Sequence, residues 1–184
     1  MKLNIGCGNN KKAGYVNIDV EPACNPDQVL DICQTPWPFP ESSVEEIVLC
    51  HVLEHVGRTP EEFKSILREL YRVLQPDGLL KITVPHPSHD TFSADSTHVR
   101  PITIDGFRMF SKALNEQWQQ AGSSATPLAL YWNIDFEITE VRIDVDKDFA
   151  SWAKANGIKV TTHALRYYRN AIRDLYFEAK AVKR

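Results

Sequence analysis

The sequence predicts an α/β protein built on one mostly parallel sheet. A short apolar run at residues 3–5 ends in Gly6-Cys7-Gly8, which is typical of a buried strand followed by a tight turn. Strand-like apolar runs then alternate with loops or helical segments through residue 85, and a clearly capped helix at residues 60–74 is followed by another apolar run. This alternation favours parallel strands joined by crossovers.

The size and composition suit one globular domain spanning residues 1–184. A net charge of −3 argues against sequence-independent nucleic-acid binding, because such binding depends on neutralising the phosphate charges. No signal peptide is recognisable, and no apolar run approaches the ~20 residues of a membrane span. We therefore expect a cytoplasmic protein with no membrane partner; its oligomeric state stays open.

The first half of the chain predicts four strands with polar residues at their ends. Residues 15–20 form a strand that ends near Asp19, residues 28–32 a short one that ends near Asp31, and residues 43–51 a strand that delivers His51. The link before residue 15 is too short for an ordinary crossover helix. The proline-rich segment 35–40 must be a surface loop, whose aromatic residues either cover the core or pack over a flat ligand.

Thr59 and Glu62 form a capping box, with Pro60 at the first helical position. On this helix, Glu69 and Arg72 are interpreted as a solvated pair. A strand follows at residues 79–84. Residues 86–103 lack periodicity and form a long polar loop, our candidate substrate lid. The remaining elements expected are helices at 104–121 and 161–173 and strands at 136–145 and 175–182, the two strands forming an antiparallel pair at the edge.

Parallel strands share a direction, so Gly6, Gly8, Asp19, Asp31 and His51 should crowd one rim of the sheet. Two carboxylates beyond a glycine turn suit a nucleoside, one binding ribose hydroxyls and the other an adenine amine. A dinucleotide site is disfavoured, because its fingerprint needs a third glycine and an acidic residue ~20 residues further on.

Five segments in order, LNIGCGN, VNIDV, a PFP loop, HVLEHV and ELYRVLQPDGLLKITVP, resemble class I S-adenosylmethionine-dependent methyltransferases, most closely small methyltransferase-11-like members. The resemblance covers residues 3–85. It implies a Rossmann-like, doubly wound, seven-stranded sheet with an antiparallel edge strand in three α/β/α layers, and S-adenosyl-L-methionine as cofactor. Gly6 and Gly8 would cradle its methionine portion. The further cofactor contacts would come from Cys7, Asp19, Val20, Asp31, Ile32 and His51.

The resemblance leaves several chemical alternatives open. His51 and His86 are the candidate catalytic residues, since a histidine can remove a proton from an O–H or N–H acceptor; a hydrogen-bonded structural role for His51 is the alternative. No metal is the favoured prediction. However, His51-Val-Leu-Glu54-His55 also resembles the E-x-x-E-H arrangement of small-RNA 3′-end methyltransferases, which implies a divalent-ion site at His51, Glu54, His55 and His86. Further possible ligands are His89, Asp90, Asp95 and His98.

The favoured function is methyl transfer to an O or N atom of a small-molecule or sugar-containing acceptor. One alternative is a metal-assisted RNA or nucleotide methyltransferase. The other is a non-catalytic S-adenosylmethionine-binding scaffold or regulatory protein.

Overall fold

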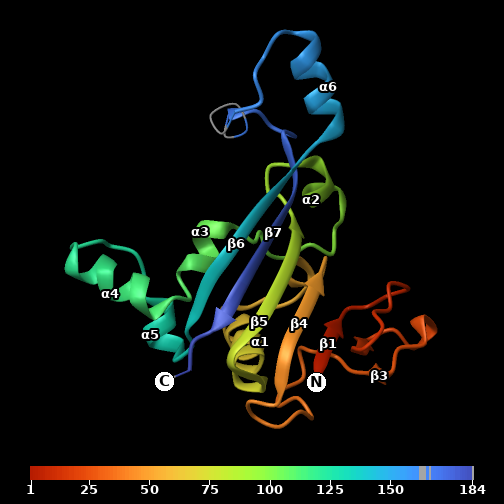
Figure 1. The fold of residues 1–184 in the computed structure, drawn as a ribbon, viewed down its shortest axis with the longest axis vertical. Helices are drawn as coiled ribbons and strands as arrows, with labels where there is room; N and C mark the ends of the chain where they lie inside the picture. The colour runs from red at the N-terminus through yellow and green to blue at the C-terminus, as the bar shows by residue number, and fades with distance from the viewer. Residues whose placement is uncertain (162–164, 166, 184) are drawn as a thin grey trace.

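The computed structural model describes residues 1–161, 165 and 167–183. Seven strands form one sheet in the order β3-β2-β1-β4-β5-β7-β6 (Figure 1). Strand β7 pairs antiparallel with both β5 and β6, and the other neighbouring strands are parallel. The strands are β1 (Lys2–Ile5), β2 (Val16–Asp19), β3 (Gln28–Val29), β4 (Val44–Cys50), β5 (Leu74–Pro85), β6 (Phe136–Val145) and β7 (Ile172–Ala181). The predicted seven-stranded, mostly parallel Rossmann-like sheet is confirmed.

The helical elements among the described residues are mostly short. They are η1 (Pro22–Cys24), η2 (Leu53–His55), α1 (Pro60–Val73), α2 (Asp90–Ala94), α3 (Ile104–Arg108), α4 (Lys112–Gln120), α5 (Leu128–Trp132) and α6 (Lys147–Ala155). None of them has the length and hydrophobicity that a membrane crossing requires.

The hydrophobic core lies between α1 and one face of the sheet. Leu3, Ile47 and Leu80 occupy matching positions on β1, β4 and β5, and all three are buried. Helix α1 covers them with its apolar face, including Ile66 and Leu67. The predicted capping box starts this helix: Thr59 Oγ1 accepts from Glu62 N at 3.2 Å, and Glu62 Oε2 accepts from Thr59 N at 3.2 Å.

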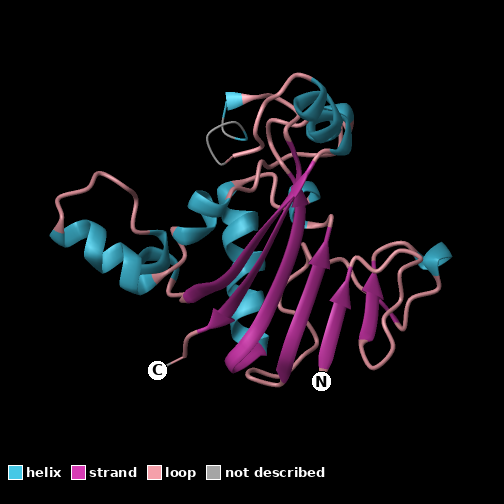
Figure 2. Ribbon diagram, turned by 45° about the horizontal axis from the view of Figure 1, so that its top comes forward, coloured by secondary structure: helices cyan, strands magenta, loops and turns pink. Residues whose placement is uncertain are grey.

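The opposite face of the sheet is polar. Asn4, Val48, Lys81 and Glu178 lie side by side across β1, β4, β5 and β7. The Lys81 ammonium lies 3.0 Å from Glu46 and 3.8 Å from Glu178, so the charges on this face are paired. In Figures 1 and 2 helix α1 lies behind the sheet, and no helix drawn for the described residues crosses the near face.

The three expected layers are therefore unequal. The second helical layer is missing from the described residues because the connections on that side are short. Residues 6–15 hold only turns, and residues 20–27 hold only turns and η1. A polar face needs no apolar cover, which agrees with the paired charges found there.

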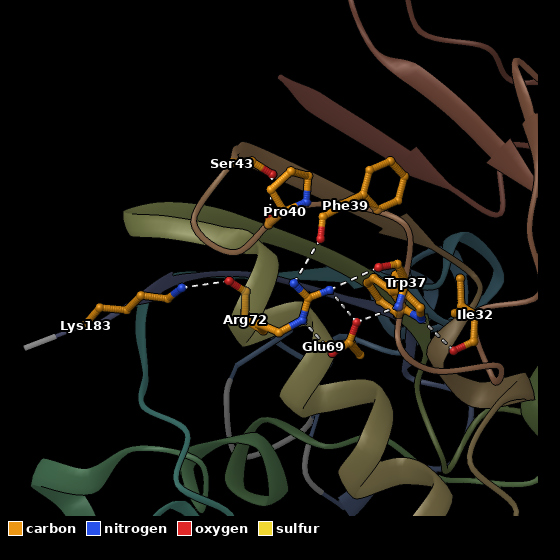
Figure 3. A network of polar contacts seen from close by, with 8 residues as sticks. All are labelled: Ile32, Trp37, Phe39, Pro40, Ser43, Glu69, Arg72 and Lys183. Atoms are coloured by element: carbon orange, nitrogen blue, oxygen red, sulfur yellow. Dashed lines mark hydrogen bonds and ion pairs between the residues drawn. The ribbon is translucent and has the colours of Figure 1, made fainter.

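Glu69 and Arg72 were expected to form a solvated pair, and this interpretation is wrong. Glu69 Oε2 accepts the Trp37 backbone N–H at 2.7 Å, and Arg72 donates to Glu69 and to the carbonyls of Trp37 and Phe39 (Figure 3). Both aromatic side chains are buried in the core. The loop 35–40 thus covers the core, and the ion pair fastens it to α1.

The second half of the chain departs from the sequence prediction in several places. The expected helix 104–121 divides into α3 and α4, because Ser111 starts a new helix by accepting from Leu114 N. Helices α5 and α6 were not expected, and segment 86–103 contains α2. Residues 162–164 and 166 of the expected helix 161–173 lie outside the described residues, and Ile172 already belongs to β7.

Candidate functional site

The carboxyl ends of β1, β2 and β4 meet at one rim of the sheet. Ile5 is in register with Ile18 on one side and Leu49 on the other, so the residues that follow these strands lie close together. These residues include Gly6, Asp19 and His51, as the sequence predicts. Asp31 follows β3, which pairs with β2 through Asp19 and Val29.

The two glycines of the first turn have different surroundings. Gly6 has φ +65°, and a Cβ there would overlap Val52 Cγ2, so Gly6 is needed for packing. Gly8 has φ +48° and would meet nothing within 4 Å of an added Cβ. Its N–H donates to Asp19 Oδ2 at 2.7 Å. The open space of the turn is therefore beside Gly8, while neighbouring Cys7 is buried.

The second strand offers both polar and apolar groups to this space. Asp19 Oδ1 accepts from Glu21 N at 2.9 Å, and each carboxylate oxygen can accept a further hydrogen bond. Val20 is 62% exposed beside it. Asp31 Oδ1 accepts from Cys33 N at 2.9 Å, and Ile32 is buried next to it. Acceptors next to an uncovered apolar side chain fit the sugar and base of a nucleoside.

His51 lies between two carboxylates. Its Nδ1 is 3.3 Å from Glu54 Oε1, and its Nε2 is 3.9 Å from Asp174 Oδ1 at the start of β7. The Glu54 contact, aided by Asp174, raises the pKa of His51 above its usual value, against the effect of burial. The backbone of His51 has φ +55°, a strained conformation of a kind that clusters at functional sites.

Asp174 had no signal in the sequence, because it reaches the rim only through the pairing of β7 with β5. Burial raises its pKa above the usual value, and the nearby His51 opposes this effect. His86 follows β5, where its N–H donates to Arg173 O at 2.8 Å. Burial, with a smaller effect of His89, lowers the pKa of His86. His51 and His86 thus follow neighbouring strands, as expected.

Segment 86–103 spans the rim and is attached at both ends. At one end, His89 Nε2 lies 3.4 Å from Asp146, and Asp90 pairs with Arg169 at 2.7 Å. At the other end, the carbonyl of Glu54 accepts from Val99 N at 2.8 Å and from Arg100 N at 3.2 Å. The segment therefore connects the tip of β6 and β7 with η2.

One further group of possible ligands occurs among the described residues. Glu54, His55 and His98 each place a ligand atom within 4.8 Å of the others. His51 and His86, the other two members of the set named from the sequence, do not belong to this group.

Comparison with known proteins gives a family match for part of the chain. A family model described as "Methyltransferase domain" matches residues 3–82. The match covers less than half of the chain and indicates an S-adenosylmethionine-dependent methyltransferase, with S-adenosyl-L-methionine as the cofactor. A search of curated proteins found no matching sequence.

Solved structures share the fold of this chain. A SAM-dependent methyltransferase from Archaeoglobus fulgidus aligns over 97% of this chain and 85% of its own, with 15% identity and a TM-score of 0.62. One from Methanosarcina mazei aligns over 100% and 92%, with 16% identity and a TM-score of 0.58. The [4+2]-cyclase SpnF aligns over 98% and 75%, with 14% identity and a TM-score of 0.54. At these identities the likeness concerns the fold.

The rim offers groups of the kind that S-adenosyl-L-methionine requires. The space beside Gly8, the carboxylate of Asp19 and the exposed Val20 supply room, polar acceptors and apolar surface. A cavity of about 680 Å³ lies elsewhere, at the amino ends of β4 and β6, and is lined by residues such as Arg68, Lys112 and Lys183. Ligands of parallel α/β sheets bind at the carboxyl ends of the strands, so the rim remains the candidate site.

Proposed function

We propose that this protein is an S-adenosylmethionine-dependent methyltransferase that moves a methyl group from S-adenosyl-L-methionine to an O or N atom of a small-molecule or sugar-containing acceptor. The observation that carries the proposal is the position of His51, which follows β4 at the same rim as Gly8 and Asp19 and lies between two carboxylates. A proton acceptor held in this way is what an O–H or N–H acceptor requires.

We propose the predicted residues as the cofactor site. The cofactor supplies an electrophilic methyl group, and the protein holds it in line with the acceptor atom. The open turn at Gly8 takes the methionine portion, Asp19 accepts from the ribose hydroxyls, and Val20 lies against the nucleoside. The complete set is Gly6, Cys7, Gly8, Asp19, Val20, Asp31, Ile32 and His51, in which Gly6 acts by allowing Val52 to pack.

His51 accepts the proton from the acceptor in this proposal. The carboxylates of Glu54 and Asp174, at 3.3 and 3.9 Å, stabilise the imidazolium that forms. His86 is the second candidate proton acceptor, since burial lowers its pKa and favours the neutral ring.

The acceptor approaches under segment 86–103 in a single domain of residues 1–184. Two observations support this role: the segment is attached on both sides of the rim, and it carries several polar side chains. The net charge of −3 favours a small acceptor over a nucleic acid. A cytoplasmic location stays a prediction from the sequence.

The test combines cofactor binding with turnover. Calorimetry measures S-adenosyl-L-methionine binding, and methyl-labelled cofactor measures transfer to a panel of hydroxyl and amine metabolites. We expect His51→Gln to lower turnover at least 100-fold, within the range of general-base effects, with a much smaller loss of cofactor affinity. Cys50→Ala, at the exposed end of the same strand, is the matched control.

Three results would contradict the proposal. Equal losses of turnover and cofactor affinity in His51→Gln would indicate a structural role for His51. Tight cofactor binding with no turnover on any acceptor would favour the scaffold alternative. Turnover confined to RNA or nucleotides would favour the nucleic-acid alternative.

A further inference from the structure

The carboxylate of Glu54 is buried without a hydrogen-bond donor. Glu54 is 0% exposed, and neither Oε1 nor Oε2 has a hydrogen-bond partner among the described residues. The His51 Nδ1 at 3.3 Å is near Oε1, but it does not meet the geometry of a hydrogen bond. Oε1 therefore has only the His51 contact and Oε2 has none; burying a charged oxygen without a partner is costly, so Oε2 indicates a missing cation or donor.

Two histidine rings lie beside this carboxylate. The centroids of His55 and His98 are 4.5 Å apart, and a ligand atom from each ring lies within 4.8 Å of the other and of Glu54. The three residues come from η2 and from segment 86–103. The backbone of Glu54 holds the two segments together by accepting from Val99 N and Arg100 N.

The hydrogen bonds of the rings determine which nitrogen is free. Thr97 donates its hydroxyl to Asp95 Oδ1 at 2.6 Å, so Thr97 Oγ1 accepts from His55 Nδ1 at 2.9 Å. His98 Nδ1 donates to the carbonyl of Phe92 at 2.8 Å. Both rings therefore carry a proton on Nδ1, which leaves the Nε2 lone pair available. A histidine that ligates a metal usually donates its other N–H in this way.

We propose that Glu54, His55 and His98 form a binding site for a divalent transition-metal ion of the Zn²⁺ type. Two imidazoles and one carboxylate suit zinc, whereas Mg²⁺ and Ca²⁺ prefer oxygen ligands. Ligands at about 2.1 Å from one ion lie at most about 4.2 Å apart, so the side chains need only a small rotation to close on it. Glu54 Oε1 faces His51, which leaves Oε2 for the ion.

Asp95 supports the site from the outside. Its Oδ1 accepts from the Thr97 hydroxyl, which in turn orients His55, whereas its Oδ2 lies 3.8 Å from His98 Nε2, the nitrogen left free for the ion. Removing such a supporting group typically weakens metal binding 10–100-fold. The inference differs from the set named from the sequence, because it contains His98 in place of His51 and His86.

The test measures metal binding without turnover, so it is independent of the proposed acceptor. The full-length protein is freed of metal by a chelator and titrated with Zn²⁺ in a calorimeter. We expect one ion per chain. Glu54→Gln and His98→Ala should each weaken binding ~100-fold or more, beyond the loss of a supporting group. His86→Ala is the matched control and should bind Zn²⁺ like the unchanged protein.

Co²⁺ absorption spectra give a second measurement that does not depend on one variant. The intense visible bands of a four- or five-coordinate Co²⁺ ion should appear in the unchanged protein and in His86→Ala, and should be lost in His98→Ala, whose fold is checked by circular dichroism. Zn²⁺ affinity that is unchanged in both Glu54→Gln and His98→Ala would overturn the proposal. A loss of binding in His86→Ala alone would overturn it in favour of the set named from the sequence.

Discussion

Val52 Cγ2 occupies the space that a side chain on Gly6 would need. This contact links the turn after β1 to the segment between β4 and η2, and it explains one of the two glycines without a ligand. The other, Gly8, has open space beside it. The two positions can therefore be separated experimentally.

Gly6→Ala and Gly8→Ala should have different effects. Both variants place alanine at a positive φ, which costs roughly 1–2 kcal/mol. Gly6→Ala also forces the new methyl group against Val52, and we expect a total loss of about 2–4 kcal/mol in the free energy of unfolding. Gly8→Ala should lose only the smaller amount but weaken cofactor binding. Urea denaturation and calorimetry measure the two effects, and equal unfolding losses would contradict this explanation.

Asp19→Asn should weaken cofactor binding. Removing the charge weakens hydrogen bonds worth about 1.5–3 kcal/mol, which corresponds to roughly a 10–150-fold rise in Kd. The asparagine amide keeps an acceptor for only one of the two backbone N–H groups, Gly8 N and Glu21 N, that the two oxygens of Asp19 bind. Glu21→Gln, two residues away and exposed, serves as the control. An Asp19→Asn protein that binds S-adenosyl-L-methionine as tightly as the unchanged protein would remove Asp19 from the site.

The Glu69–Arg72 pair should make the free energy of unfolding depend on pH in the acidic range. The Arg72 hydrogen bonds, with help from the Trp37 N–H, lower the pKa of Glu69 below its ordinary value of 4.5, although burial opposes them. Because the pKa is lowered on folding, the ionised Glu69 stabilises the folded state fully above about pH 4.5. This stabilisation is lost as the pH falls through the folded-state pKa. Glu69→Gln should lose about 1.5–3 kcal/mol at neutral pH and less below pH 4.

The measurement is urea unfolding between pH 3 and pH 7 for the unchanged protein and for the variant. Glu116→Gln on α4, where the side chain is exposed, controls for the loss of one negative charge. If the unchanged protein and Glu69→Gln showed parallel curves over this range, the ion pair would not be the cause of the acid sensitivity.

Arg100 should anchor one end of segment 86–103. Its guanidinium donates to Gly57 O at 2.6 Å and lies 4.2 Å from the centre of the Phe63 ring. We expect Arg100→Ala to lower the free energy of unfolding by about 1–3 kcal/mol and to speed amide exchange at residues 95–100. Arg108→Ala, which removes an exposed pair with Asp105, should cost under about 1 kcal/mol. Unchanged exchange at residues 95–100 would show that other contacts hold the segment.

Local signals in the sequence were sufficient for the first half of the fold. Each of these signals acts on residues close to it in the sequence: the glycine turn ends a strand, the capping box at Thr59 starts a helix, and the alternating apolar runs form strands. The order of these strands placed Asp19 and His51 on one rim. A similar local signal was available but unused for α4, since Ser111 is a preferred N-cap residue three positions before Leu114.

The remaining features depend on contacts between distant segments. Glu69 looks like a surface residue until the loop 35–40 folds over it, and no helical spacing reveals this. Asp174 reaches His51 only because β7 inserts between β5 and β6. His98 joins Glu54 through a loop without periodicity. Contacts of this type form only when the fold brings distant segments together, so a local sequence pattern does not reveal them.

The polar face of the sheet also explains how the chain could shorten its first crossover. A helix inserted between β1 and β2 would rest on Asn4 and Asn17, which are paired on these two strands, and it would gain little apolar contact in return for the entropy lost in ordering its residues. Lengthening this connection in an engineered chain should therefore leave the added segment unfolded unless the strands beneath it are made apolar at the same time.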